Sequence, residues 1–288
     1  MSEYTYKLDM AGYLWELISP IALQVRGNCA PFLADRPGAD ISLRFRLGRP
    51  PERGTVVHEA SPRVWREEDG ALRIERLPGV ASSACSCIWL RESDPLAVTG
   101  CIYPDRTEFI STVDQLLQIS ELELLLAQLQ IFSLHSSLVR RAEGDAILFT
   151  APSGTGKSTQ ATLWEQFAGA ETINGDRSLL RRVDGAWTAF GSPFAGTSGI
   201  YRRDQAEVRA IIVLRQAPQN TIRRLSAAEA FRAVYSESVL PRWHQDAHQR
   251  VISLVTEIVS EVPVYLLACT PDERPVTLLK KTLEGETT

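Results

Sequence analysis

The sequence predicts an α/β fold of the α+β kind, with a β-rich N-terminal lobe in residues 1–110 and a mixed sheet with flanking helices in residues 111–288. Three features carry this prediction. Short alternating segments, punctuated by Pro, Gly and Asp, run from Tyr4 to about Phe109. The apolar period becomes helical after Ser111. The glycine-rich stretch Ala151–Ser158 follows an apolar segment typical of a strand.

Composition excludes several classes of protein. The formal net charge of −4 gives no global attraction to nucleic acid. The five cysteines are odd in number and scattered, which favours reduced thiols over a disulfide framework. There is no basic-plus-apolar N-terminal signal and no run of about 18 apolar residues. We therefore expect a cytoplasmic protein with no membrane segment and no nucleic-acid partner.

In the N-terminal lobe, turn residues separate the expected strands. A hairpin turns at Glu68-Asp69-Gly70, where Asp-Gly supplies the positive backbone angles of a tight turn. The expected strands are Ile21–Arg26, Ile41–Leu47, Arg63–Glu67, Ala71–Leu77 and Val80–Glu92.

Leucine-rich helical spacing marks residues 116–131. Ser120-Glu121-Leu122-Glu123 matches a capping box, so we expect a helix to restart there. The run is short, which favours a core helix over a coiled coil.

Hairpins, strands and helices alternate in the C-terminal half. A glycine-rich loop spans Gly191–Gly199, and Ser226–Glu229 forms a second capping box. The expected strands are Ser137–Arg141, Ala146–Thr150, Ser178–Val183, Ala186–Phe190, Val208–Leu214 and Val264–Ala268, and the expected helices are Ser158–Phe167, Asp246–Val262 and one from about Arg274.

Ala151–Ser158 is a P-loop with Ala in place of the usual first Gly. Its backbone N–H groups would converge on phosphate oxygens at a helix N-terminus. Lys157 would reach the β- and γ-phosphates, Ser158 would be a ligand of Mg²⁺, and Thr159 would touch the α-phosphate. The alternative is a chance glycine-rich turn. The expected nucleotide-binding residues are Ser153, Gly154, Thr155, Gly156, Lys157, Ser158 and Thr159.

The usual Walker B acid is missing, because the best apolar strand ends in Arg215. Guanine-binding and transporter signatures are also absent from the sequence, which argues against GTPase and ABC classes. The next acid is Asp176, nineteen residues after Lys157, in Asn174-Gly175-Asp176-Arg177. Asp176 is therefore the leading candidate for a catalytic base or a metal ligand.

The chain resembles the HPr kinase/phosphorylase family, whose kinase domain is related to PEP carboxykinase. The resemblance rests on His135 before a hairpin, on the loop Ser153–Ser158 and on the pair Asp176-Arg177, and it covers roughly residues 133–215. It implies an HPr kinase C-terminal-domain-like fold that binds ATP and Mg²⁺. It also implies that Asp176 accepts the acceptor's proton or ligates Mg²⁺, with His135 close by.

Two departures from the family bear on the substrate. Gly175 stands where the family has a first Asp, so one carboxylate must serve or another residue must assist. The family's Glu-containing signature is also replaced by Gly191–Gly199. The acceptor is therefore not expected to be the HPr phosphocarrier. The chain looks more like HPr-kinase-related enzymes that phosphorylate the C-terminal serine of lasso-peptide precursors.

Several residues have a functional and a structural interpretation. His135 would orient or tune Asp176, or is an inert strand histidine. Gly191–Gly199 would close over the acceptor, or merely join two strands. His244 and His248 have metal-ligand spacing but are expected to be a solvated pair. The residues that could contact phosphate or substrate are Arg177, Arg202 and Arg203.

Three functions remain open. The first is an ATP-dependent serine kinase that acts on a peptide. The second is a small-molecule kinase that acts on free serine or a sugar, and the third is an ATP-sensing regulator without transfer. A homo-oligomer is expected only by analogy with related enzymes.

Overall fold

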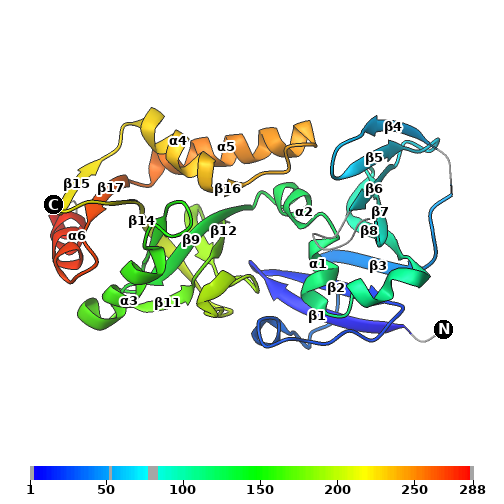
Figure 1. Ribbon diagram of the computed structural model, residues 1–288, viewed down its shortest axis with the longest axis horizontal. Coiled ribbons are helices and arrows are strands. Elements are labelled where there is room, and N and C mark those ends of the chain that lie inside the picture. Colours follow the sequence, from blue (N-terminus) through cyan, green and yellow to red (C-terminus); the bar gives the residue numbers. More distant parts are fainter. Residues whose placement is uncertain (1–2, 52–53, 77–83, 286–288) are drawn as a thin grey trace. The chain divides into compact units, whose positions relative to one another are not determined.

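The computed structural model describes residues 3–51, 54–76 and 84–285 of the 288-residue chain. It contains two compact units (Figure 1): the first comprises Met1–Leu129 and Pro241–Gln245, and the second comprises Gln130–Leu240 and Asp246–Thr288. Each unit has a mixed sheet with helices, which is the fold class expected from the sequence. The domain boundary at residue 110 stays a prediction, while the compact units part at Leu129.

The first unit is built on an eight-stranded sheet of order β1-β2-β3-β8-β7-β6-β5-β4 among its described residues. The pairs β2–β3 and β3–β8 are parallel, and the other pairs are antiparallel. The hairpin at Asp69-Gly70 is confirmed, whereas Leu77 lies outside the described residues. The strands are β1 (Tyr4–Met10), β2 (Tyr13–Ser19), β3 (Ile41–Leu47), β4 (Thr55–His58), β5 (Arg63–Arg66), β6 (Leu72–Arg76), β7 (Ser86–Arg91) and β8 (Asp94–Ile102).

The strand predicted at Ile21–Arg26 is wrong. Backbone groups of Leu23 bond to the Tyr6 hydroxyl, which donates to Leu23 O at 3.1 Å and accepts from Leu23 N at 2.7 Å. Gln24 forms only an isolated bridge with Thr112. A side chain thus supplies bonds that a neighbouring strand would have made. The strand predicted at Val80–Glu92 begins at Ser86, and residues 80–83 lie outside the described part.

The helices of the first unit are η1 (Ala30–Phe32), η2 (Pro104–Phe109), α1 (Val113–Gln118) and α2 (Leu122–Gln128). The capping box predicted at Ser120 is wrong, because Ser120 Oγ donates back to Leu116 O at 2.6 Å. Glu121 precedes α2 with a left-handed φ of 56° and makes no side-chain cap. The leucines of α2 are buried, so the core-helix interpretation is confirmed.

The second unit has nine described strands in the order β10-β9-β12-β13-β14-β17-β15, with β11 and β16 paired to β9 and a further β10–β14 pairing. Two strands change partners along their length: β9 pairs with β12 and then with β10, and β14 pairs with β13 and then with β10 and β17. The strands are β9 (Phe132–Arg140), β10 (Ala146–Thr150), β11 (Glu171–Asn174), β12 (Arg177–Val183), β13 (Ala186–Phe190), β14 (Gln205–Gln216), β15 (Thr221–Arg224), β16 (Ser238–Val239) and β17 (Val264–Cys269).

Helices cover both faces of this sheet. In Figure 1, α4 and α5 lie on one side of β9 and β14, and α3 lies on the other. A buried cluster joins α3 and α6 to the strands through Trp164, Phe149, Ile212 and Leu279. The helices are α3 (Lys157–Ala168), η3 (Gly196–Ser198), α4 (Ala227–Glu237), α5 (Gln245–Glu261) and α6 (Arg274–Gly285).

Most local predictions for the C-terminal half are confirmed. Both hairpins form, and the Ser226–Glu229 capping box opens α4. The strand predicted at Val208–Leu214 is longer, spanning Gln205–Gln216, because its N-terminal end also pairs with β13.

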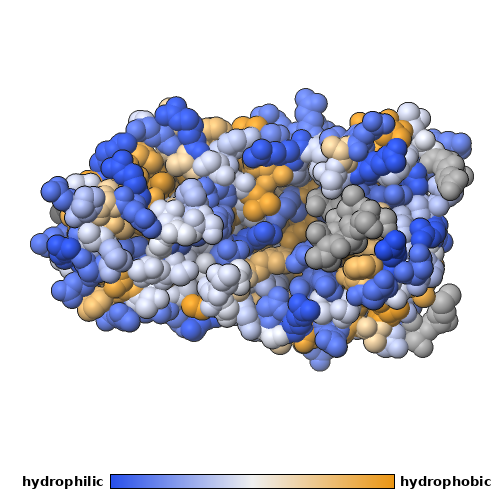
Figure 2. Space-filling model, in the orientation of Figure 1, coloured by the Kyte–Doolittle hydropathy of each residue, from blue (hydrophilic) through white to orange (hydrophobic). Residues whose placement is uncertain are grey.

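Figure 2 shows hydrophilic residues spread over the visible face, with hydrophobic ones in scattered patches. Within the described ranges, none of the helices has the length and apolar character needed to cross a membrane.

Candidate functional site

The predicted P-loop connects β10 to α3. Gly154 and Gly156 have positive φ angles of 79° and 117°, a backbone conformation that residues with a side chain rarely adopt. A loop whose backbone is not covered by side chains at its glycines therefore precedes the 12-residue helix α3. The backbone N–H groups there, together with the partial positive charge of the helix end, suit an anion. Ser153, Ser158 and Thr159 are exposed around this loop, and Thr155 is half-buried.

Lys157 is buried at the base of the loop, with 8% of its surface exposed. Its Nζ donates to Ala151 O at 2.8 Å, which ties the first residue of the motif to the first residue of α3. Burial lowers the pKa of Lys157, and the negative charges of Glu237 and Asp176 oppose that shift. The ammonium therefore shares one electrostatic environment with two carboxylates.

Asn174 holds Asp176 in place. The Asn174 Oδ1 accepts hydrogen bonds from the backbone N–H groups of Asp176 at 2.9 Å and Arg177 at 2.7 Å. Asn174 is fully buried, and Ser136 N donates to Asp176 O at 2.9 Å. A buried amide thus forms an Asx turn that fixes the backbone of the carboxylate.

The glycine-rich loop Gly191–Gly199 also engages this turn. Asn174 Nδ2 donates to Ser192 O at 2.9 Å and to Phe194 O at 3.3 Å. Ser192 Oγ donates to Arg177 O at 2.7 Å. The loop therefore packs on the Asp176 turn, and whether it opens and closes stays a prediction.

Gly175 lies directly against the side chain of Ser198. A Cβ built on Gly175 would overlap the Ser198 side chain. A Cβ on Gly196, which has a φ of 54°, would lie 2.6 Å from Asp176 Oδ1. Both glycines are thus needed for the close approach of the loop to the acid turn.

His135 lies between two carboxylates. Its Nδ1 is 3.0 Å from Glu237 Oε2, and its Nε2 is 3.5 Å from Asp176 Oδ1. The histidine is on β9, where it pairs with Arg177 of β12, and Glu237 is the last residue of α4. The side chains of Asp176 and Glu237 are 32% and 14% exposed. The sheet thus brings together the acid and the histidine that the sequence singled out.

Sequence reasoning missed Glu237. Its contact with His135 spans 102 residues, and no motif surrounds it. The only available signal was the Ser226 capping box, which places the start of α4 but not the residue at its end. Glu237 thus adds a second carboxylate beside His135.

The arginines have different surroundings. The Arg177 guanidinium lies 5.1 Å from the centre of the Phe194 ring, beside the Asp176 turn. Arg202 forms an ion pair with Glu171, which also binds Arg140. Arg203 is exposed next to it. Arg177 therefore lies beside the acid turn.

The two histidines at metal-ligand spacing, His244 and His248, are both half-buried. His248 Nε2 lies 2.8 Å from the Tyr235 hydroxyl. No cluster of three or more His, Cys, Asp or Glu side chains suited to a metal occurs in the part of the chain that was described. A Mg²⁺ ion bound with a nucleotide needs only one or two carboxylates, since phosphates and waters complete its shell. Asp176 and Ser158 carry oxygen donors of the kind that Mg²⁺ prefers.

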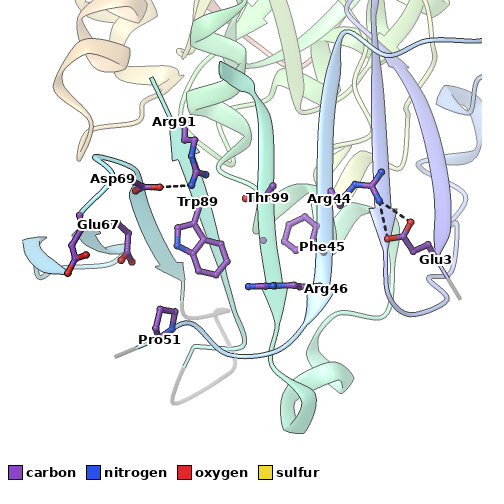
Figure 3. Close-up of a pocket in the computed structure, with 12 residues that line it drawn as sticks. Glu3, Arg44, Phe45, Arg46, Pro51, Glu67, Asp69, Trp89, Arg91 and Thr99 are labelled. Atoms are coloured by element: carbon purple, nitrogen blue, oxygen red, sulfur yellow. Dashed lines mark hydrogen bonds and ion pairs between the residues drawn. The ribbon is translucent and has the colours of Figure 1, made fainter. Parts of the chain in front are cut away.

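A separate pocket of about 630 Å³ lies on the sheet of the first unit (Figure 3). Arg46, Trp89 and Thr99 line it from β3, β7 and β8. Its other arginines bond to acids: Arg44 to Glu3 at 3.0 Å and Arg91 to Asp69 at 2.6 Å. It contains none of the predicted site residues.

Comparison with known proteins adds little to this geometry. No protein-family model matches the chain, and no curated protein matches it. Among solved structures, the Hpr(Ser) kinase/phosphatase from Coxiella burnetii is similar over 54% of this chain and 89% of that chain, with a TM-score of 0.31 and 15% sequence identity.

Proposed function

We propose that the chain is an ATP- and Mg²⁺-dependent kinase that phosphorylates a hydroxyl group. The observation that carries this proposal is the His135 imidazole held between Asp176 and Glu237, with the charges of both carboxylates reaching Lys157 of the phosphate loop. A phosphate cradle and a proton acceptor thus share one site. Phosphoryl transfer requires mainly positioning and charge stabilisation, and this arrangement supplies both.

The phosphate loop and the carboxylates suit ATP with Mg²⁺. The loop amides and Lys157 would offset charge on the β- and γ-phosphates. Ser158 and Asp176 would hold the metal, which neutralises developing charge on the phosphates when bound.

Asp176 has the role of general base in this proposal. The acceptor oxygen attacks the γ-phosphorus, its proton passes to the Asp176 carboxylate, and the bond from the γ-phosphorus to the bridging oxygen breaks to release ADP. In this proposal, His135 donates from Nδ1–H to Glu237 Oε2, which lies 3.0 Å away, and the neutral ring presents Nε2 to Asp176 Oδ1 at 3.5 Å. His135 can then take the proton onward, and Glu237 stabilises the resulting imidazolium.

The acceptor that we favour is a serine of a peptide. The sequence resemblance supports the C-terminal serine of a lasso-peptide precursor. Free serine and sugars are the alternative acceptors. The third possible function is a regulator that binds ATP without transferring phosphate. A cytoplasmic location and a homo-oligomeric state belong to the same proposal.

Asp176→Asn tests the reaction. It keeps the size of the side chain but removes the base, so turnover should fall by about 10²- to 10⁴-fold while ATP binding persists. Transfer of label from γ-labelled ATP measures turnover, and calorimetry measures binding. Asp184→Asn is the matched control, because Asp184 has a left-handed φ of 48° in a hairpin turn, which Asn tolerates. Unchanged turnover in Asp176→Asn would exclude the base role.

Three acceptor pools distinguish the substrates. Wild-type protein is incubated with labelled ATP and either peptides ending in serine, free serine and sugars, or buffer. Label in peptide supports the first proposal, and peptides ending in alanine are the control. Label only in free serine or sugars would indicate a small-molecule kinase instead. Bound ATP without any transfer would contradict the kinase assignment.

A further inference from the structure

Two cysteines of the first unit lie opposite each other in the sheet. Cys87 is on β7 and Cys101 is on β8, the two central strands of the eight-stranded sheet, and they are partners in the antiparallel register. Each is 1% exposed, and their Sγ atoms are 3.1 Å apart. Both are free thiols. The two sulfur atoms are therefore close enough for a small movement to bring them to bonding distance.

The backbone of β7 and β8 has the geometry that a disulfide needs. Directly opposite residues of an antiparallel pair have Cα atoms about 4.5 or 5.5 Å apart, and disulfides span about 4.4–6.8 Å. An S–S bond is about 2.05 Å long, so the sulfur atoms must approach by about 1 Å. Gly100, next to Cys101, permits a close approach of the strands, because a Cβ there would lie 2.9 Å from Cys87 O. Rotation of the two side chains can therefore form the bond without a new strand register.

The other three cysteines have different surroundings. Cys85 Sγ donates to Ser86 Oγ at 3.8 Å, and Cys269 Sγ accepts from Gln160 Nε2 at 3.5 Å. Cys29 is fully buried, and burial raises the pKa of its thiol to about 12. Among the described residues, Cys87 and Cys101 are the two cysteines whose sulfur atoms contact each other.

The hydrogen bond between these two thiols makes them chemically unequal. It lowers the pKa of Cys101, which burial opposes, and it raises the pKa of Cys87, which burial also raises. The positive charge of Arg46, the partner of Cys101 on β3, favours the Cys101 thiolate, and the negative charge of Glu75 on β6 disfavours it. Because the thiolate is the nucleophile, Cys101 is the thiol expected to react first.

We propose that Cys87 and Cys101 form a redox site that hydrogen peroxide converts into a reversible disulfide. The Cys101 thiolate attacks a peroxide oxygen, the O–O bond breaks, and the departing hydroxide takes up the proton that Cys101 has lost, which leaves Cys101 as a sulfenic acid. The Cys87 sulfur then attacks the Cys101 sulfur, the S–O bond breaks, and the hydroxide leaves with the Cys87 proton as water. Two thiols thus lose two electrons and two protons, and peroxide is reduced to two molecules of water.

The pocket of Figure 3 provides a route for the oxidant. Trp89 packs against the thiol pair and also lines this pocket, together with Arg46. A shift of the Trp89 side chain therefore opens a path from the pocket to the sulfur atoms for a molecule as small as hydrogen peroxide.

The cross-link would join the two halves of the sheet. The strands β1, β2, β3 and β8 lie on one side of the bond, and β7, β6, β5 and β4 lie on the other. The two cysteines are 14 residues apart, so the bond closes a loop that restricts the unfolded chain. The melting temperature of the oxidised protein should therefore rise by about 5–10 °C, and dithiothreitol should reverse the rise.

Thiol counting on the full-length wild-type chain tests the proposal. The protein is treated with hydrogen peroxide, denatured, and blocked with N-ethylmaleimide before its intact mass is measured. The mass should show three blocked thiols after peroxide and five after subsequent dithiothreitol, because the chain has five cysteines. Peptide mapping with fragmentation should assign the cross-link to Cys87 and Cys101.

Serine variants test the pairing and the order of reaction. Cys87→Ser and Cys101→Ser should each lose the cross-link. Cys85→Ser is the matched control, because Cys85 is also buried and precedes Cys87 by two residues, and it should keep the cross-link. In Cys87→Ser the sulfenic acid has no partner thiol, so dimedone should label Cys101.

Each result supports or overturns a part of this inference. Five blocked thiols after peroxide would overturn the redox site, and a cross-link between any other two cysteines would overturn the pairing. Dimedone on Cys87 of Cys101→Ser, with none on Cys101 of Cys87→Ser, would overturn the order of reaction. The wild-type mass and peptide map decide the first two points even if a variant does not fold. These measurements involve no phosphate transfer, so they are independent of the proposed kinase reaction.

Discussion

At the scale of single residues, the buried ammonium of Lys157 lowers the stability of the fold and is also the group expected to bind phosphate. Its ammonium is buried, and burial lowers its pKa below the ordinary 10.5. The native state thus holds this proton less tightly than the unfolded chain does. As pH falls through the window below 10.5, the charged lysine costs stability, and a bound triphosphate would repay that cost.

Lys157→Met should therefore separate the two effects. Without nucleotide, its melting temperature should be no lower than that of the wild type. At an ATP concentration of 100 Kd, the wild type should gain about 2.7 kcal/mol, or about 5 to 10 °C, and the variant should gain nothing. Differential scanning fluorimetry measures both. Lys281→Met, at an exposed lysine of α6, should behave as the wild type. An ATP-dependent rise in Lys157→Met would contradict the assigned role.

At the scale of elements, the loop Gly191–Gly199 and the turn at Asp176 depend on each other's shape. The close approach of Ser198 to Gly175 leaves no space for a side chain. Ser198 is itself fixed, because its Oγ donates to Ala195 O at 2.6 Å and accepts from Ile200 N at 3.2 Å. The loop and the acid turn therefore restrict each other's backbone positions, in addition to the bonds that Asn174 makes within the turn.

Gly175→Ala should disturb this packing. The added methyl must displace Ser198, which should cost about 1–3 kcal/mol and lower turnover by shifting Asp176. Chemical denaturation measures the first effect, and label transfer measures the second. The double variant with Ser198→Gly should lose less than the sum of the two single variants. Gly285→Ala, where a Cβ meets open space, is the control. Strict additivity would contradict direct contact.

At the scale of the whole molecule, local signals predicted local structure well. The hairpins at Asp69-Gly70 and Asp184-Gly185 were predictable because each turn fixes its own strands. The capping box predicted at Ser120 was wrong because the same hydroxyl can cap a following helix or donate back to Leu116 O. The sequence does not decide between these two hydrogen bonds. The strand, turn and helix around Ala151–Ser158 were predictable from their motif. Glu237 was not, because its meeting with His135 depends on how α4 docks against β9.

Hydrogen exchange tests whether the nucleotide site belongs to the second unit alone. The phosphate-loop residues and His135, Asp176 and Glu237 lie in that unit, and the phosphate donors are amides of the P-loop and the first turn of α3. ATP with Mg²⁺ should therefore slow exchange most in residues 151–160. Amides of the first unit should exchange as before. Lys157→Met should show no slowing. Protection that appears only in the first unit would place nucleotide binding outside the phosphate loop and contradict the mechanism.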